Sequence, residues 1–129
     1  MSADDGPPPL LVVDAANVVG SVPDGWWRDR RAATERLLDA IAELPVTGLA
    51  DLPGPVDVTV VVEGAARGVA ARTGIRVVEA SGSGDDAIVD VVADNTDRSV
   101  AVVTSDRELR SRVRDLGART LGPRTIRAQ

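Results

Sequence analysis

The fold of this chain is set by a stretch near its start, Leu10-Leu11-Val12-Val13-Asp14. Four apolar residues follow one another without a polar break, and a carboxylate ends the run. A short run that is apolar at every position is typical of a strand buried on both faces, as in a parallel sheet. We therefore predict an inner strand that carries Asp14 at its carboxyl end.

Similar runs recur along the chain and alternate with helical patterns. Further strands are predicted at 58–62, 75–78 and 100–103, with a possible fifth strand at an edge, 119–121. Apolar residues recur at helical spacing from near Trp27 to just before Pro45, again after Asp85, and once more up to Gly117. Three helices are therefore expected between the strands.

The remaining segments carry weaker signals. Residues 64–72 predict a short helix, and the stretch 45–55, rich in Pro and Gly, predicts an exposed connection. Residues 1–9 are acidic and rich in Pro, which predicts a disordered tail and not a signal peptide. Residues 10–129 are then expected to form a single domain. No apolar run approaches the roughly 20 residues that span a bilayer, so we expect a cytoplasmic protein with no membrane partner.

The alternation of strands and helices predicts an α/β fold with a central parallel sheet, right-handed crossovers and flanking helices. In such sheets the ligand site lies beyond the carboxyl ends of the strands. Asp14 follows the first strand, and Asp106 follows the fourth. Asp85 and Asp86 follow the loop after the third strand. These four carboxylates, far apart in the sequence, are therefore expected to face the same edge.

The composition limits the chemistry available at that edge. The chain contains no Cys and no His, and its 15 basic residues are all Arg, so it contains no Lys either. This excludes disulfides, Ser-His-Asp triads, classical zinc sites and catalytic lysines. A metal would have oxygen ligands, which suits Mg²⁺, Mn²⁺ or Ca²⁺. The formal net charge of −5 weighs against strong nonspecific binding to nucleic acid.

Crowded carboxylates repel one another, so burying them requires a cation or protonation. We predict that the four aspartates hold Mg²⁺ or Mn²⁺, with Asp86 as the close alternate of Asp85. A bound metal assists phosphodiester hydrolysis, and no His or Lys is present to replace it. Asn17 is a candidate for orienting a water or the scissile phosphate. Thr104 and Ser105 are candidates for hydrogen bonds to phosphate oxygens or to the carboxylates.

Each of these residues also has a purely structural interpretation. Asp14 can organise a turn through its own backbone. Ser105 and Glu108 have the spacing of a capping box, in which Ser105 begins the helix and Asp106 only complements the helix dipole. Ser83 can likewise cap a helix whose first turn is acidic. Convergence on one edge favours function over these alternatives, because caps need not converge.

The only aromatic residues, Trp26 and Trp27, allow two interpretations. They can form a platform on which a base stacks, but we favour one tryptophan filling the core under the turn at 23–25. Arginine suits phosphate through its planar fork. Arg28 and Arg107 lie nearest the predicted edge, so we predict that these two contact RNA, while most other arginines lie on solvated helix faces.

Three segments carry a family resemblance. They are Val-Val-Asp14-Ala-Ala-Asn17-Val-Val-Gly20, Gly82-Ser83-Gly84-Asp85-Asp86-Ala-Ile and Val-Val-Thr104-Ser105-Asp106-Arg107. In this order they resemble the NYN branch of the PIN-like nucleases, and within it the YacP-like group. The resemblance implies a three-layer PIN-like fold with sheet order 3-2-1-4 and a metal-dependent ribonuclease activity. It also implies an acidic site at Asp14, Asp85 and Asp106, with Asn17 and Ser105 alongside.

The function expected from these features is that of an endoribonuclease that hydrolyses RNA phosphodiesters at a Mg²⁺ or Mn²⁺ site. The alternative is a noncatalytic module that binds RNA, a ribosome or a protein partner and retains the fold. A small-molecule phosphohydrolase is a third and weaker alternative. Association with ribosomes, homodimer formation and the number of bound metals stay open from the sequence.

Overall fold

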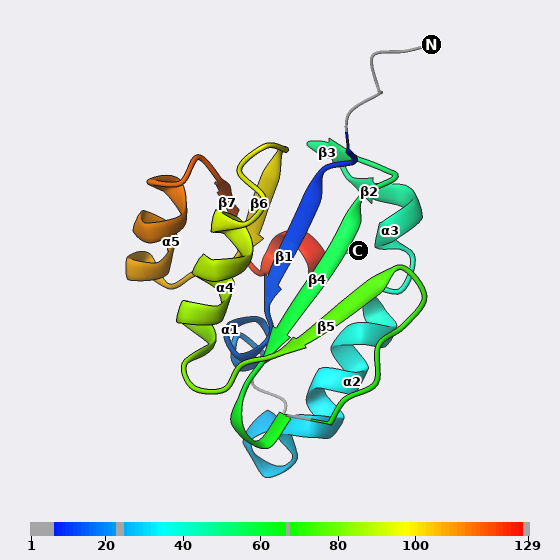
Figure 1. Ribbon diagram of the computed structural model, residues 1–129. Coiled ribbons are helices and arrows are strands. Elements are labelled where there is room, and N and C mark those ends of the chain that lie inside the picture. Colours follow the sequence, from blue (N-terminus) through cyan, green and yellow to red (C-terminus); the bar gives the residue numbers. More distant parts are fainter. Residues whose placement is uncertain (1–6, 23–24, 67, 128–129) are drawn as a thin grey trace.

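The computed structural model describes residues 7–22, 25–66 and 68–127, so residues 1–6 of the expected tail lie outside the described residues. A parallel five-stranded sheet forms the centre, in the order β5-β4-β1-β6-β7 (Figure 1). Its strands are β1 (Leu10–Asp14), β4 (Asp57–Val62), β5 (Ile75–Glu79), β6 (Val100–Val103) and β7 (Arg119–Leu121). Numbered along the chain, this is the order 3-2-1-4 with a fifth strand at the edge, which confirms the predicted topology.

β1 lies in the middle of the sheet and separates two hydrophobic cores. It pairs in parallel with β4 along its whole length on one side and with β6 on the other. Because side chains alternate across a strand, Leu11 and Val13 face one core, whereas Leu10 and Val12 face the other. None of the four is more than 4% exposed, as expected of a strand that is apolar at every position.

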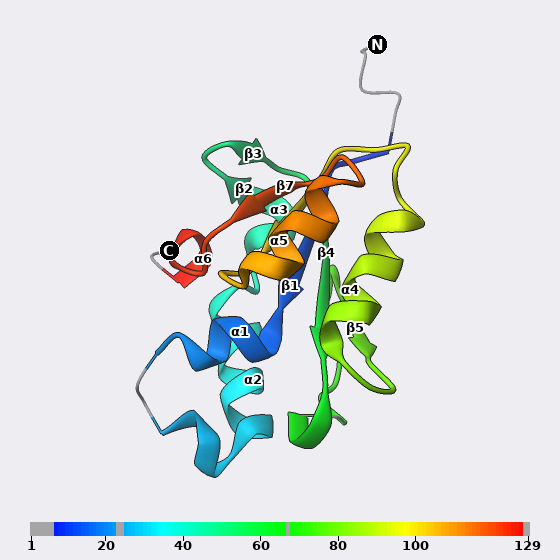
Figure 2. The same cartoon turned by 90° about the vertical axis from the view of Figure 1, so that its left-hand side faces the viewer.

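Two helices cover one face of the sheet, as Figure 2 shows: α4 (Gly84–Ala93) and α5 (Arg107–Arg114). Each helix buries two side chains that lie one turn apart, which are Ile88 and Val92 in α4 and Leu109 and Val113 in α5. Apolar residues four positions apart lie on the same side of a helix, so each helix presents one stripe to the sheet. In α4 the partly buried Ala87, Val89 and Val91 widen this stripe, whereas the other positions of α5 are mainly charged.

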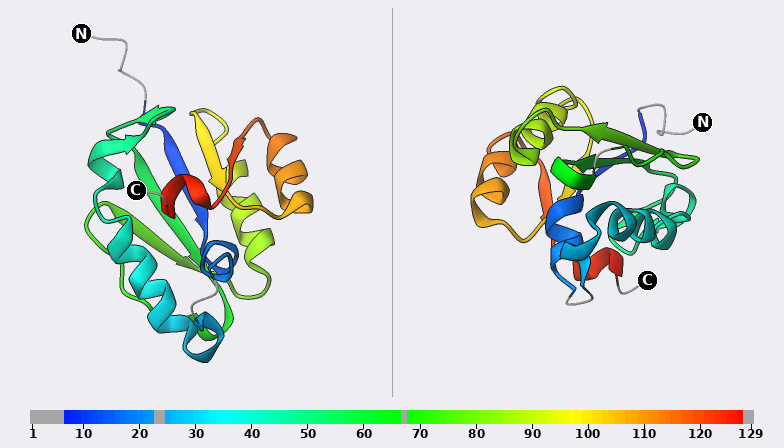
Figure 3. Two further views of the ribbon diagram at one scale, coloured as in Figure 1. Left: turned by 180° about the vertical axis from the view of Figure 1, so that it is seen from behind. Right: turned by 90° about the horizontal axis from the view of Figure 1, so that it is seen from below.

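The opposite face is covered by α2 together with several short elements (Figure 3). They are α1 (Ala15–Gly20), the 3₁₀ turns η2 (Trp26–Arg28) and η3 (Gly64–Ala66), α2 (Arg30–Ala40), α3 (Leu44–Thr47), the hairpin strands β2 (Gly48–Leu49) and β3 (Leu52–Pro53), and α6 (Arg124–Arg127). The sheet therefore lies between two layers, and the predicted three-layer α/β architecture is confirmed. Within the described ranges, no helix is long and apolar enough to cross a membrane.

Two helical predictions are wrong in extent. The helix expected to run to just before Pro45 ends at Ala40, and Pro45 lies instead in the first turn of α3. A proline is tolerated there, because the first N–H groups of a helix have no intrahelical partner. Among the described residues of 64–72, only the short η3 is helical, and the chain then leads to β5 without a further helix.

The stretch 45–55 is not the exposed connection that its Pro and Gly content predicted. It folds into α3 and the antiparallel β2–β3 hairpin. Leu49 and Leu52 are only 7% and 5% exposed and belong to the core on the α2 face. Val46 is by contrast 77% exposed. Some apolar side chains of this stretch are therefore buried and one is exposed. The content of Pro and Gly alone does not predict which.

Candidate active site at the carboxyl edge of the sheet

Asp14 is a carboxylate buried at the carboxyl end of the central strand, with 5% of its surface exposed. Its Oδ1 accepts a hydrogen bond from the backbone N–H of Asn17 at 3.3 Å, so Asp14 caps α1. Its Oδ2 accepts a hydrogen bond from the Thr104 hydroxyl at 2.9 Å. Burial is the main cause that raises the pKa of Asp14 to about 6; the two hydrogen bonds lower it, and the charges of Asp85 and Glu63 add to the rise.

A hydrogen-bond network joins the turn after β1 to the turn after β6. The backbone N–H and the hydroxyl of Ser105 both donate to Oδ1 of Asn17, at 2.9 and 3.1 Å. Thr104 is fully buried and holds Asp14, which confirms that this hydroxyl donates to a carboxylate. Among the described residues, the side-chain nitrogen of Asn17 has no acceptor, so its two N–H groups stay available to a ligand.

Asp106 lies at the start of α5 and is itself the helix cap. Its Oδ1 accepts a hydrogen bond from the backbone N–H of Leu109 at 3.0 Å, and its own N–H donates to the Thr104 hydroxyl at 3.1 Å. The capping box considered for Ser105 is therefore wrong, because the helix begins one residue later. The Thr104 hydroxyl thus donates to the Asp14 carboxylate and accepts the backbone N–H of Asp106, so it joins the two turns that carry these residues.

Asp85 lies in the first turn of α4, which Ser83 caps by accepting the Asp85 N–H at 3.1 Å. The structural interpretation of this segment, a cap followed by an acidic turn, is therefore correct. Burial is the first cause that raises the pKa of Asp85, and the charges of Asp106 and Glu63 add to it, while Arg112 lowers it. The carboxylates that follow three different strands are thus close enough to perturb one another.

Asp86 lies beside Asp85, and its charge contributes to the rise in the pKa of Asp85. Its Oδ1 accepts a hydrogen bond from Arg112 of α5 at 3.0 Å, and its side chain is 72% exposed. Asp86 therefore connects α4 to α5 at the surface.

Glu63 is a site residue that the sequence analysis missed. It follows the last residue of β4, as Asp14 ends β1, and its Oε2 accepts the backbone N–H of Gly84 at 3.0 Å. A side chain on Gly84 would collide with this carboxylate, so the glycine is what permits the close approach. Its charge raises the pKa of both Asp14 and Asp85. The overlooked signal is its position directly after a strand.

The overall arrangement is already known from solved structures. The fold is similar to that of Rae1 (YacP) from Bacillus subtilis. A tryptophan-to-leucine variant of Rae1 superposes with a TM-score of 0.75 and 20% identity, covering 93% of this chain and 73% of that one. A second Rae1 structure gives 0.68 and 21% identity, covering 92% and 71%. The predicted likeness to the fold of YacP is thereby confirmed.

Sequence comparison alone finds no such relationship. No protein-family model matches the chain, and no curated protein matches it. The likeness to Rae1 is therefore one of three-dimensional arrangement, carried by the order of the strands and the placement of the helices.

The cationic and aromatic residues predicted to bind RNA lie at the surface of this Rae1-like fold. The Arg28 guanidinium lies 5.9 Å from the centre of the Trp27 ring, and Trp27 is 56% exposed. Trp27 is thus not the tryptophan that fills the core, and the side chain of Trp26 lies outside the described part. Arg107 is exposed at the first position of α5, beside Asp106.

The oxygen donors at this edge fit an open metal site better than a closed one. Within residues 7–22, 25–66 and 68–127, no three acidic side chains are gathered tightly enough to hold an ion by themselves. Mg²⁺ commonly keeps several waters and takes one or two carboxylates together with a substrate phosphate. The carboxylates here raise one another's pKa values but do not form a complete ligand shell. Such an incomplete acidic group suits a hydrated ion.

A small cavity of about 110 Å³ opens beside the acidic edge of the Rae1-like fold, between α1 and α2. Its wall is mainly alanine and valine, with Glu63 and Arg30 as the charged members. The cavity places an apolar surface next to the carboxylates. Such a combination suits a ligand that has a flat apolar part attached to a phosphate.

Proposed function

We propose that this chain is a metal-dependent endoribonuclease that hydrolyses RNA phosphodiesters at the carboxyl edge of its sheet. One observation supports this above all others. Asp14 is 5% exposed, has a pKa of about 6, and is further perturbed by carboxylates that follow other strands. Burying a carboxylate beside other carboxylates works against folding unless a cation compensates the charge, so the presence of Asp14 at this position supports a divalent metal site.

In this proposal Asp14, Asp85 and Asp106 hold the ion. Mg²⁺ or Mn²⁺, when bound, polarises a phosphate and lowers the pKa of an attacking water. The Thr104 hydroxyl keeps the Asp14 carboxylate in place through its 2.9 Å hydrogen bond. Glu63 adds negative charge from the end of β4.

The neighbouring polar residues position the substrate. Ser105 fixes Oδ1 of Asn17, so the Asn17 side-chain N–H groups are held in one direction and can donate to a phosphate oxygen. Arg107 is placed beside Asp106 to contact the adjacent phosphate. The cavity between α1 and α2 can take the apolar face of a base beside the scissile bond.

The proposal predicts the effect of removing single carboxylates. Asp14→Asn and Asp106→Asn should each lower Mn²⁺-dependent cleavage of single-stranded RNA by roughly 100-fold or more, because metal ligands are lost. Cleavage is followed by gel with a labelled oligonucleotide, and folding is followed by circular dichroism. Asp90→Asn removes the same charge from the exposed side of α4 and should cleave at the wild-type rate.

The double variant Asp14→Asn/Asp106→Asn gives the strictest test of the proposed catalytic site. If Asp14→Asn combined with Asp106→Asn folds and still cleaves RNA at the wild-type rate, the site described above is not the catalytic one. Loss of activity on adding a chelator, with recovery on adding Mn²⁺, is expected for the wild-type chain and for Asp90→Asn.

A second candidate function is a noncatalytic module that binds RNA or a protein. The observation in its favour is that Asp14 and Asp106 both cap helices, so each carboxylate has a structural role without any metal. Titration calorimetry with Mn²⁺ separates the two candidates. If the chain is a nuclease, Asp14→Asn should bind Mn²⁺ more weakly than the wild type. If it is a noncatalytic module, the wild type and Asp14→Asn should give the same heats of binding.

A further inference from the structure

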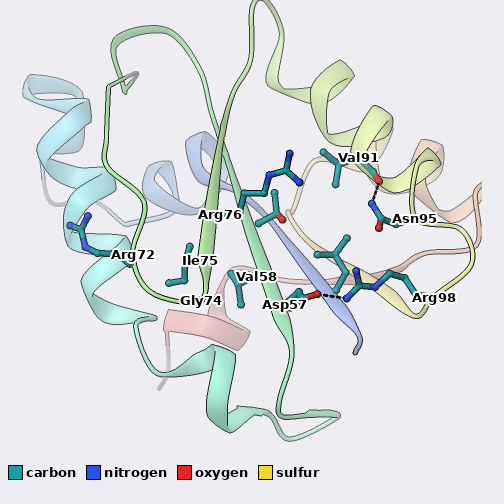
Figure 4. A pocket seen from close by; sticks show the side chains of 11 residues that line it. Asp57, Val58, Arg72, Gly74, Ile75, Arg76, Val91, Asn95 and Arg98 are labelled. Atoms are coloured by element: carbon teal, nitrogen blue, oxygen red, sulfur yellow. Dashed lines mark hydrogen bonds and ion pairs between the residues drawn. The ribbon is translucent and has the colours of Figure 1, made fainter. Parts of the chain in front are cut away.

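A cavity of about 380 Å³ lies at the opposite end of the sheet from the acidic edge, and the proposed function does not use it (Figure 4). It lies where β1, β4 and β5 begin, since Leu10, Asp57 and Ile75 all line it. The end of α4 closes its other side through Val91 and Asn95. We call it the amino-edge cavity.

Strand register brings polar side chains together in this cavity. Thr59 of β4 pairs with Arg76 of β5, and Asp57 lies two residues before Thr59. Residues two apart on a strand, and residues directly opposite on its neighbour, point to the same face. That face is the one covered by α4, so these side chains lie under the helix end. Figure 4 shows the Arg76 side chain directed toward Val91 of α4.

Three arginines line the cavity and differ in how they are held. Arg72 is paired with Asp39 and donates to the carbonyl of Ala70. Arg98 donates to a carboxylate oxygen of Asp57 at 2.6 Å and to the carbonyl of Pro8, and only 13% of its side chain is exposed. Arg76 is exposed and makes no hydrogen bond or ion pair with any described residue. Every hydrogen-bond donor of the Arg76 guanidinium is therefore available, beside a second arginine already fixed in place.

We propose that the amino-edge cavity is a binding site for a phosphate group, with Arg76 as its main ligand and Arg98 beside it. The guanidinium fork matches two oxygens of a phosphate and stays charged at any physiological pH. The Thr59 hydroxyl and the Asn95 amide supply further hydrogen-bonding groups. The volume lies within the range of about 300–1,000 Å³ found for ligand sites.

The location makes this site independent of the proposed catalytic one. β5 runs five residues, so the two ends of the sheet are separated by about 17 Å at the usual rise along a strand. The phosphate has two conceivable sources, a free nucleotide or the backbone of an RNA strand that continues past the acidic edge. Both present the same group to Arg76. β5 is an edge strand, and a charged residue such as Arg76 can serve only to prevent aggregation there. In that case Arg76 would bind neither a nucleotide nor a nucleic-acid strand.

The test uses the whole chain in a chelator, so that no metal binds the acidic edge and a failed nuclease proposal does not affect the result. Inorganic phosphate, adenosine monophosphate, adenosine and a single-stranded DNA trinucleotide are titrated separately, with amide chemical shifts as the readout. Shifts are expected to concentrate at Thr59, Arg76 and Asn95. Arg76→Gln should weaken the binding roughly tenfold or more, as expected for a charge-assisted hydrogen bond.

Arg124→Gln is the matched control. It removes the same charge from an exposed position of α6, on the opposite face of the sheet, and should leave the affinity unchanged. Binding of phosphate or the mononucleotide identifies a free nucleotide as the source, and binding of the trinucleotide alone identifies a nucleic-acid strand. The proposal is overturned if no phosphate-bearing probe binds, if adenosine binds as well as its monophosphate, or if Arg76→Gln binds like the wild type.

Discussion

A carboxyl group in the position of Asp14 opposes folding whenever it is ionised. The strand before it and the helix after it exclude water, and the Thr104 and Asn17 hydrogen bonds recover only part of the lost solvation. The residue with the greatest structural disadvantage is thus the one that would gain most from a bound cation. This is the link between local energetics and function at the scale of single residues.

The raised pKa gives a testable dependence of stability on pH. Between 3.8 and about 6 the folded chain holds a proton on Asp14 that the unfolded chain has released, so stability falls as pH rises through this window. The difference of about 2 in pKa corresponds to roughly 3 kcal/mol at most. Urea unfolding in a chelator should show this loss between pH 4 and pH 7 for the wild type and a flatter profile for Asp14→Asn. Equal profiles would show that Asp14 is not the group responsible.

Glu63 offers a second prediction at this scale. Glu63→Gln keeps an oxygen that accepts the Gly84 N–H but removes the charge that raises the pKa values of Asp14 and Asp85. Mn²⁺ affinity should fall roughly tenfold, as expected for a residue that tunes a metal site from outside its ligands. Calorimetry measures the change. Glu108→Gln, an exposed carboxylate on α5, should leave the affinity intact, and a similar loss in both variants would contradict the special role of Glu63.

Several site residues were predictable because they directly follow strands. Asp14, Thr104 and Asp106 come at or just after the ends of apolar runs, and parallel topology brings those ends together. Glu63 occupies an equivalent position and was overlooked. Asp86 was grouped with Asp85 because they are adjacent in sequence, and in the structure Asp86 also pairs with Arg112.

At the scale of elements, the inner strands were predicted well and the irregular segments poorly. The run 100–103 is apolar at every position and 58–62 at all but Thr59, because both faces of these strands are buried, so their pattern is unambiguous. The β2–β3 hairpin has only two residues in each strand, which is too short for any period to be seen. Its burial depends on contacts with α3 and the sheet that no local pattern encodes.

The burial of this hairpin predicts a specific cost. Leu52→Ala should lower the free energy of unfolding by about 2–5 kcal/mol, because a 5% exposed leucine leaves a cavity when it is truncated. Val46→Ala, six residues earlier and 77% exposed, should change stability by no more than about 0.5 kcal/mol. Urea denaturation compares the two. Equal small effects would mean that the hairpin is not part of the core.

At the scale of the whole molecule, charge and topology act together. The net charge is −5, and several arginines are already engaged with carboxylates. These ion pairs are Arg31–Glu35, Arg72–Asp39, Arg98–Asp57 and Arg112–Asp86. Because 20 acidic residues outnumber the 15 arginines, the chain carries no excess of positive charge to spread along a nucleic-acid backbone, so we expect contact with RNA to be concentrated at a few positions.

This distribution predicts a weak dependence of RNA affinity on salt. For single strands, each phosphate contacted contributes a slope of about −0.7 in a plot of log K against log salt concentration. We expect a total slope between about −1 and −3 for single-stranded RNA bound to the Asp14→Asn variant, measured by fluorescence anisotropy. A slope steeper than about −5 would indicate an extended cationic track that the described arginines do not provide.

The central position of β1 has a consequence for how the chain is made. β1 lies between β4 and β6 in the sheet but precedes both along the chain. It therefore lacks its β6 neighbour until residue 103 has been added. A nascent or truncated chain that stops before residue 100 therefore leaves one side of β1 with unpaired backbone groups, a template for association with other chains. Asp14 would then also lack Thr104, so the acidic group is assembled only after β6 and the turn that follows it have been added.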